Sequence, residues 1–133
     1  MATPAAVGTR TAGGATVAAG PVSVTLARGI TAQYEPLEPT AVFLPSSNPI
    51  YLTFTANGAG ANARLRTVWI ATNVGSAAPA GTVLDEASVT LPRGTESGAF
   101  NLKQTGGPWA VGDYRLDVYL NDALLLSAPF TIQ

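Results

Sequence analysis

Residues 112–132 read GDYRLDVYLNDALLLSAPFTI, and this stretch decides the fold. Up to residue 120, apolar side chains alternate with polar ones at every second position, which is the period of a half-buried strand. Asn121-Asp122 then supplies the residue types that a two-residue hairpin turn prefers. The pattern predicts a C-terminal antiparallel hairpin whose inward residues are Tyr114, Leu116, Val118 and Leu120 on the first strand and Leu124, Leu126, Phe130 and Ile132 on the second.

The rest of the chain repeats this alternation in short runs that are separated by some of its 14 glycines and 10 prolines. Pro36 and Pro39 limit any strand within residues 30–44 to a short or edge position, because proline cannot donate a hydrogen bond to a sheet ladder. No helical periodicity interrupts the series. The pattern predicts further strands over residues 22–27, 50–56, 64–72, 82–91 and 97–105.

Two arginines orient the strand expected over residues 64–72. Arg64 and Arg66 must remain hydrated, so Leu65, Thr67 and Trp69 should point inward. Val68 and Ile70 are then left on the outer face. On the next two strands, the same reasoning predicts an inward set of Ala87, Val89, Leu91, Phe100 and Leu102.

The chain length of 133 residues is that of one domain, long enough to form a single hydrophobic core. Seven or eight short antiparallel strands without helices between them favour an all-β sandwich of two sheets. Residues 1–20 are rich in alanine, glycine and threonine, and they carry too little apolar surface to fold alone. We therefore expect a flexible N-terminal arm or linker over residues 1–20 and a β-sandwich over residues 21–133.

An inward Trp69 and the string Gly112-Asp113-Tyr114-Arg115-Leu116 together resemble immunoglobulin-like domains. In that family a core tryptophan packs on a disulfide between the sheets, and a tyrosine bonds back to the upstream backbone. Leu116 stands where the second cysteine would be, and Phe54 or its neighbours where the first would be. The resemblance implies that apolar packing replaces the disulfide, with a core signature of Phe54, Trp69, Tyr114 and Leu116. Ala110 stands where the family's corner motif has an aspartate.

The C-terminal stretch is also similar to a pattern found in bacterial secreted or lipoprotein-type proteins, W-x-x-G-x-Y-x-V-x-V-Y-L-(N/D)-G ending in F-x-V. Here Trp109, Gly112 and Tyr114 begin the match, and Phe130-Thr131-Ile132 ends it. The resemblance implies an extracytoplasmic setting, which would be secreted, periplasmic or at the cell surface. It carries over no catalytic residue. The N-terminus itself lacks the features of a secretory signal, so we expect that a signal was either removed or never present.

Composition excludes several classes of function. The net charge of −1 provides no basic field for nucleic acid. No apolar run is long enough for membrane insertion. Cysteine and histidine are absent, which removes thiolate and imidazole metal sites and the Ser-His and Cys-His nucleophile systems. We therefore expect no catalytic residue, no cofactor, no bound metal and no enzymatic activity.

Carboxylate side chains are the remaining candidates for acid-base work or for ion binding. A calcium loop would need alternating acidic residues, a spacing that the chain lacks. The pairs are therefore expected to be solvated surface charges, and Asn121-Asp122 is expected to be a simple turn. The pairs are Glu35 with Glu38, Asp85 with Glu86, and Asp113 with Asp117.

Two surface features could bind a partner. Arginine, tyrosine and apolar residues on one outer sheet face are typical of a protein interface, although scattered surface apolar residues are also ordinary. Trp109 is either a stacking platform for a sugar or peptide, or a plug that closes the end of the sandwich. The expected interface consists of Arg64, Arg66, Val68, Ile70, Arg115, Tyr119 and Leu125.

These features favour a non-catalytic structural or interaction module that binds a protein partner or copies of itself. The contact would be made through the outer sheet face or through the N-terminal arm, where Ala15 to Ala19 could add a strand to a neighbour's edge. One alternative is an accessory domain that binds carbohydrate or peptide. A further alternative is a viral decoration or tail protein.

Overall fold

The computed structural model describes residues 15–104 and 107–133, and within them every regular element is a β-strand. Seven strands are long, and three are short pieces near the N-terminus. In chain order they are β1 (Thr16–Ala19), β2 (Val22–Ile30), β3 (Pro36–Pro39), β4 (Val42–Phe43), β5 (Ile50–Ala56), β6 (Ala63–Asn73), β7 (Thr82–Leu91), β8 (Glu96–Leu102), β9 (Gly112–Leu120) and β10 (Ala123–Ile132). The three short strands account for the difference from the predicted seven or eight.

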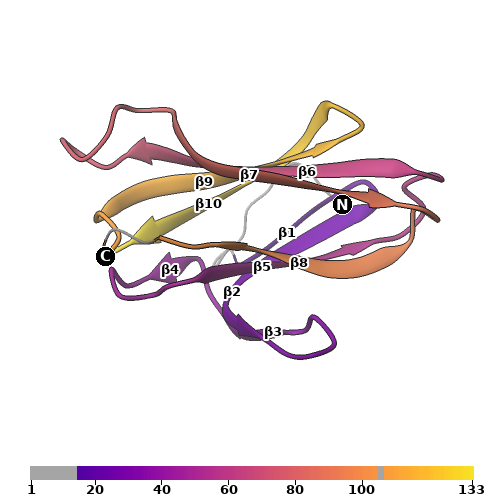
Figure 1. Cartoon of the computed structure of the whole chain (residues 1–133), viewed down its shortest axis with the longest axis horizontal. Coiled ribbons are helices and arrows are strands. Elements are labelled where there is room, and N and C mark those ends of the chain that lie inside the picture. Colours follow the sequence, from indigo (N-terminus) through magenta and orange to yellow (C-terminus); the bar gives the residue numbers. More distant parts are fainter. Residues whose placement is uncertain (1–14, 105–106) are drawn as a thin grey trace.

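The strands form two sheets that lie one above the other (Figure 1). One sheet has the order β1-β2-β5-β8, with β3 also paired to β2, and the other has the order β4-β10-β9-β6-β7. All pairs are antiparallel except β4 with β10, which are parallel. The chain changes sheets five times, between β3 and β4, β4 and β5, β5 and β6, β7 and β8, and β8 and β9. The predicted all-β sandwich of two sheets is therefore confirmed.

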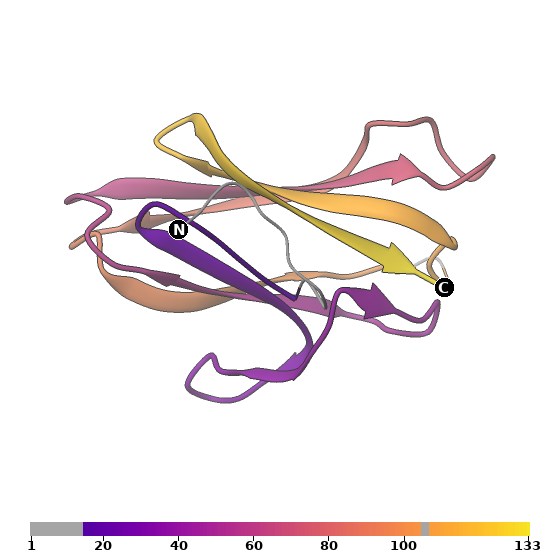
Figure 2. The ribbon, with the colours of Figure 1, turned by 180° about the vertical axis from the view of Figure 1, so that it is seen from behind.

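The two long sides of the sandwich differ. On one side β1 contacts β10, so the two sheets meet, as Figure 2 shows from behind. On the other side lie β7 and β8, each of which has a single neighbour within its sheet in the described part of the chain. These two strands are the outer edges of the open side.

The N-terminal segment joins the sandwich earlier than predicted. Residues 16–19 of the expected arm form β1, which pairs with Val22–Thr25 of the same chain. The strand that the sequence suggested for a neighbour's edge is thus added to the chain's own β2. Residues 1–14 of the expected arm lie outside the described residues.

Phe130 lies at the centre of the core. Its ring is 5.3 Å from that of Tyr114, 5.9 Å from that of Trp69 and 5.8 Å from that of Phe43, between ring centroids. The four residues of the expected core signature are all buried in this one core cluster. Phe54, however, pairs its ring with Phe100 at 5.6 Å rather than joining the rings around Phe130.

A β-bulge corrects the prediction for the last strand. Leu124 pairs with Tyr119 and Leu126 pairs with Val118, so Leu125 is an extra residue between them. Because one inserted residue reverses the alternation, Leu124 faces outward and is 57% exposed. Leu125, predicted on the outer face, instead packs partly against the core.

The turn after β9 and one residue of β7 were also predicted from the sequence. Asn121 and Asp122 both have positive φ, 51° and 69°, as the two-residue turn requires. Ala87 was predicted to point inward; it pairs in register with the buried Thr67 but is itself exposed. We attribute its exposure to its place on β7, the edge strand of the open side.

Candidate functional site

The outer face of the β4-β10-β9-β6-β7 sheet brings most of the predicted interface residues together. Arg66, Val68 and Ile70 of β6 pair in register with Tyr119, Asp117 and Arg115 of β9. Arg64, the next outward residue on β6, is exposed. We call this surface the arginine face, and it comprises Arg64, Arg66, Val68, Ile70 and Glu86 together with Arg115, Asp117, Tyr119 and Ser127.

Arg66 contacts one side chain on each of the two strands that flank β6. Its Nη1 donates a hydrogen bond to Glu86 Oε2 of β7 at 3.0 Å. Its guanidinium carbon lies 4.3 Å from the centre of the Tyr119 ring on β9, which is a cation–π arrangement. The guanidinium is therefore fixed across three neighbouring strands.

Asp117 differs from the sequence prediction. It was expected to be a solvated surface charge, but it is only 4% exposed. Arg115 Nε donates to both of its carboxylate oxygens, at 3.1 and 3.2 Å, and Ser127 Oγ donates at 2.7 Å. These charge-assisted bonds compensate the carboxylate for the water that it loses.

The apolar residues of the arginine face also differ from expectation. Val68 and Ile70 point outward, as predicted, but they are only 7% and 6% exposed. In register, Val68 lies between Asp117 and Glu86, and Ile70 lies beside Arg115. We attribute the burial of Ile70 to the aliphatic stem of Arg115, which can cover apolar surface while its charged end stays partly in water, and the burial of Val68 to its neighbours on β7 and β9.

Trp109 closes one end of the sandwich. It is 4% exposed, its indole Nε1 donates to the carbonyl of Ser47, and its backbone N donates to the carbonyl of Pro45 at 2.9 Å. Trp109 is one of the residues that line a hollow of about 320 Å³. It belongs to the core cluster and is almost fully buried, so it fits the plug interpretation rather than an exposed stacking platform.

The tyrosine that follows Trp109 makes the bond that the resemblance implies. Tyr114 Oη donates to the carbonyl of Ala110 at 2.5 Å. Burial raises the pKa of Tyr114 above its usual value of 10.0. The hydroxyl thus links the start of β9 to the loop that carries Trp109.

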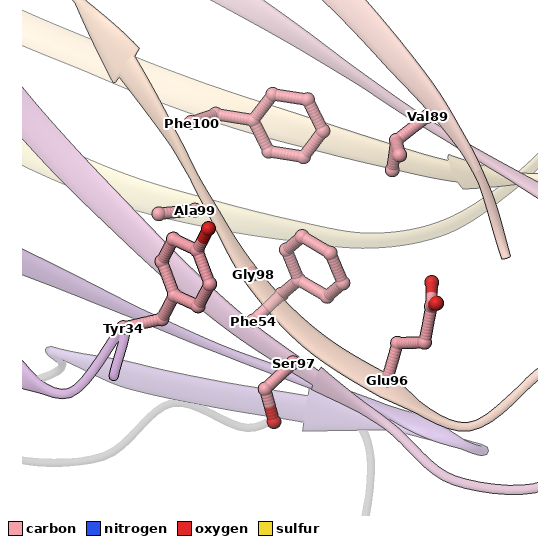
Figure 3. Close-up of a pocket in the computed structure, with 8 residues that line it drawn as sticks. All are labelled: Tyr34, Phe54, Val89, Glu96, Ser97, Gly98, Ala99 and Phe100. Carbon is pink, nitrogen blue, oxygen red and sulfur yellow. The ribbon is translucent and has the colours of Figure 1, made fainter. Parts of the chain in front are cut away.

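A groove of about 460 Å³ follows the free edge of β8 (Figure 3). No sequence motif marked it. The most informative residue is Gly98, because a Cβ atom there would lie 2.7 Å from Cε2 and Cζ of Phe54. The Phe54 ring therefore occupies the space that a side chain at position 98 would take. The lining residues are Tyr34, Phe54, Val89, Glu96, Ser97, Gly98, Ala99 and Phe100.

Two further features concern metals and membranes. Among residues 15–104 and 107–133, no three Asp or Glu side chains gather as a metal site would require. The same residues include no helix with the length and apolar character needed to cross a membrane. The carboxylates discussed from the sequence do not converge into one site there.

Comparisons with known proteins show only distant likeness. No protein-family model matches the chain, and no curated protein matches it. One similar structure is a beta-D-glucoside glucohydrolase from Trichoderma reesei, with a TM-score of 0.44, 15% identity, and coverage of 86% of this chain and 18% of that one. Another is the alkylpurine DNA glycosylase AlkC from Pseudomonas fluorescens bound to DNA with an abasic site analogue, with a TM-score of 0.41, 17% identity, and coverage of 83% and 30%. The chain spans less than a third of either protein.

Proposed function

We propose that this domain is a non-catalytic structural module that assembles with copies of itself through the arginine face. The observation that supports this most is the double network on that face, in which Arg66 joins Glu86 and Tyr119 while Arg115 joins Asp117. A surface whose charged side chains are already ordered loses little conformational entropy when a partner binds.

The composition of the face fits a protein partner. Arginine and tyrosine are the residue types most enriched where protein interfaces derive their binding energy. Here they surround an apolar base of Val68 and Ile70, which further desolvation would bury completely. Because an interface of this kind excludes water, the hydrogen bonds of Arg66 and Arg115 would strengthen on binding.

The charges favour a second copy as the partner. The face carries arginines 64, 66 and 115 and also the carboxylates of Glu86 and Asp117. A surface with both signs can be complementary to itself when two copies meet across a twofold axis. A partner surface with charges of only one sign would repel either the arginines or the carboxylates of this face.

We place this assembly outside the cytoplasm as part of the same proposal. Its support is the similarity of residues 109–132 to the C-terminal pattern of secreted and lipoprotein-type bacterial domains. Fractionation of the source cells with an antibody against this chain tests the location. Chain recovered only with cytoplasmic markers would contradict it.

Sedimentation velocity over a concentration series tests the assembly. The wild-type chain is expected to associate as concentration rises, and Arg66→Glu is expected to weaken that association, because it places a carboxylate beside Glu86. Arg93→Glu is the matched control, since Arg93 lies in the exposed turn between β7 and β8. Equal association of both variants, or a wild type that remains monomeric at every soluble concentration, would overturn the proposal.

A further inference from the structure

β8 is an edge strand, since in the described part of the sandwich its single neighbour within the sheet is β5. β8 pairs with β5 along its full length, from Ile50 with Leu102 to Ala56 with Glu96. In an antiparallel sheet, alternate residues of an edge strand turn their N–H and C=O groups away from their single neighbour. These groups are a template for another strand.

The groove gives this edge two walls. Gly98 and Phe100 face the interior, because their register partners Phe54 and Leu52 are core residues. Ala99 faces the opposite side, where the Tyr34 ring lies beside it (Figure 3). A strand added to β8 would therefore place alternate side chains against the aromatic interior and against Tyr34.

We propose that a second copy of this chain pairs with β8 antiparallel, across a twofold axis at Ala99, to form a continuous sheet. The inference rests on the proposed self-assembly but names a different surface from the arginine face. In this register Ala99 meets Ala99 of the second copy, and Gly98 meets Phe100 of the second copy. Glu96 then lies opposite Leu102 of the second copy.

Side-chain sizes along β8 fit this register. Gly98 has no side chain, and the Phe54 ring beneath it reaches the strand edge. An aromatic side chain opposite an edge glycine covers the exposed space beside it. The twofold axis would place Phe100 of each copy there, so that it extends the existing Phe54–Phe100 ring pair. The small Ala99 at the axis lets the two backbones approach.

Charge favours antiparallel pairing of two copies over parallel pairing. β8 begins at Glu96, and Lys103 follows directly after its last residue. Antiparallel pairing brings the acidic end of each strand to the basic end of the other, whereas parallel pairing would bring like charges together. The twofold arrangement uses the β8 edge of both copies, so pairing through β8 alone ends in a dimer rather than a fibre.

Charge reversal at the axis tests the pairing by sedimentation velocity. Ala99→Lys and Ala99→Glu should each weaken dimerisation at least about tenfold, because like charges would lie directly opposite each other. An equimolar mixture of the two variants should restore the dimer. Ser97→Lys is the control, because residue 97 would face Asn101 of the second copy, and its dimer should persist. A mixture that associates no more strongly than either variant alone, or equal loss of the dimer in Ser97→Lys, would overturn the register.

Cysteine cross-linking gives a second readout, because the chain has no native cysteine. With oxidised glutathione as oxidant, two Ala99→Cys chains should each lose a thiol proton and form one disulfide across the axis. Ser97→Cys alone should not cross-link, but a mixture of Ser97→Cys with Asn101→Cys should. Cross-linking of Ser97→Cys to itself, or none at position 99, would contradict the axis.

The two surfaces can be separated by combining variants. If both contribute, Arg66→Glu should leave the β8 dimer, and Ala99→Lys should leave only association through the arginine face. Association that depends on Arg66 but not on Ala99 would overturn the β8 inference and leave the proposed function intact. Dimers that depend on Ala99 but not on Arg66 would overturn the role of the arginine face and leave the β8 pairing intact.

Discussion

The two long sides of the sandwich differ in how the edges of the two sheets are covered. On the closed side, β1 covers the edge of β2 and contacts β10, and a Cβ atom on Gly20 would lie 3.6 Å from Cδ1 of Leu125. On the open side, Phe100 and Val89 are only partly buried, and Gly98 provides no side chain at all. One edge is completed within the chain, and the other is the edge at which we propose that a second copy pairs.

The aromatic residues follow this division. Phe130 packs against three rings in the middle of the core, where it is 2% exposed. Phe100 pairs only with Phe54 beside the open edge. Because burial of apolar surface is the main source of stability, the first group should hold the fold together. The second should contribute less to stability and more to association.

Truncating each aromatic group should give the largest effect. Phe130→Ala should lower the free energy of unfolding by about 3 to 5 kcal/mol, since it leaves a cavity among buried rings. Phe100→Ala should cost no more than about half as much, because its ring is already partly in water. Urea denaturation of the two variants measures both values, and an equal cost would remove the distinction between the two sides.

Adding a side chain at Gly98, on the open edge, should have the next largest effect on stability. Gly98→Ala should cost about 1 to 3 kcal/mol, because the new Cβ atom would displace the Phe54 ring. Gly29→Ala is the matched control within the same sheet, since the nearest atom to its new Cβ is Leu37 Cβ at 3.5 Å, an ordinary contact. Thermal unfolding of both should show a loss only for Gly98→Ala; similar values would mean that Phe54 moves freely.

The corner of β9 should give a pH-dependent effect. Because burial raises the pKa of Tyr114 above 10.0, the folded chain holds that proton more tightly than the unfolded chain. Its contribution to stability is complete below pH 10.0 and falls as pH rises further, by at most about 1.4 kcal/mol per pH unit. Tyr114→Phe should cost about 0.5 to 1.5 kcal/mol at neutral pH and show a shallower alkaline loss. Parallel alkaline profiles of the variant and the wild type would contradict this.

The two arginines of the arginine face that form ion pairs should affect stability unequally, and Arg66 should give the smallest effect of all. Arg115→Ala should cost about 1 to 3 kcal/mol, since it removes a donor from the buried carboxylate of Asp117. Arg66→Ala should cost about 0 to 1 kcal/mol, because its partner Glu86 is 56% exposed and water screens the ion pair. Chemical denaturation ranks the two, and a larger loss for Arg66→Ala would mean that the cation–π contact dominates the face.

Much of the fold could be predicted from alternation alone. The pattern that begins at Tyr114 identified the C-terminal hairpin, and Trp69 was correctly assigned to the interior. The bulge at Leu125 could not be predicted, because three consecutive leucines carry no signal for which of them is the extra residue. For β3 and β4 the sequence indicated only that any strand within residues 30–44 would be short or at an edge, and for β1 only a segment able to add to a sheet edge. Their bounds could not be predicted, because each strand is too short to show a period.

The candidate site was predicted less completely, for a physical reason. Strand alternation showed which residues share the outer face of β6, but not how far their neighbours cover them. The burial of Asp117 and Val68 depends on side chains that come from three strands. The groove beside Gly98 depends on the pairing of β5 with β8, which no local pattern encodes.

Amide hydrogen exchange along β8 at increasing protein concentration tests most directly whether the open side is completed by a second copy. We predict that the outward amides of residues 96–102 become protected as concentration rises, while those of β5 are protected at every concentration. Ala99→Lys should remove the concentration-dependent part. Fast exchange of these β8 amides at every concentration, or protection that does not change with concentration, would contradict the account.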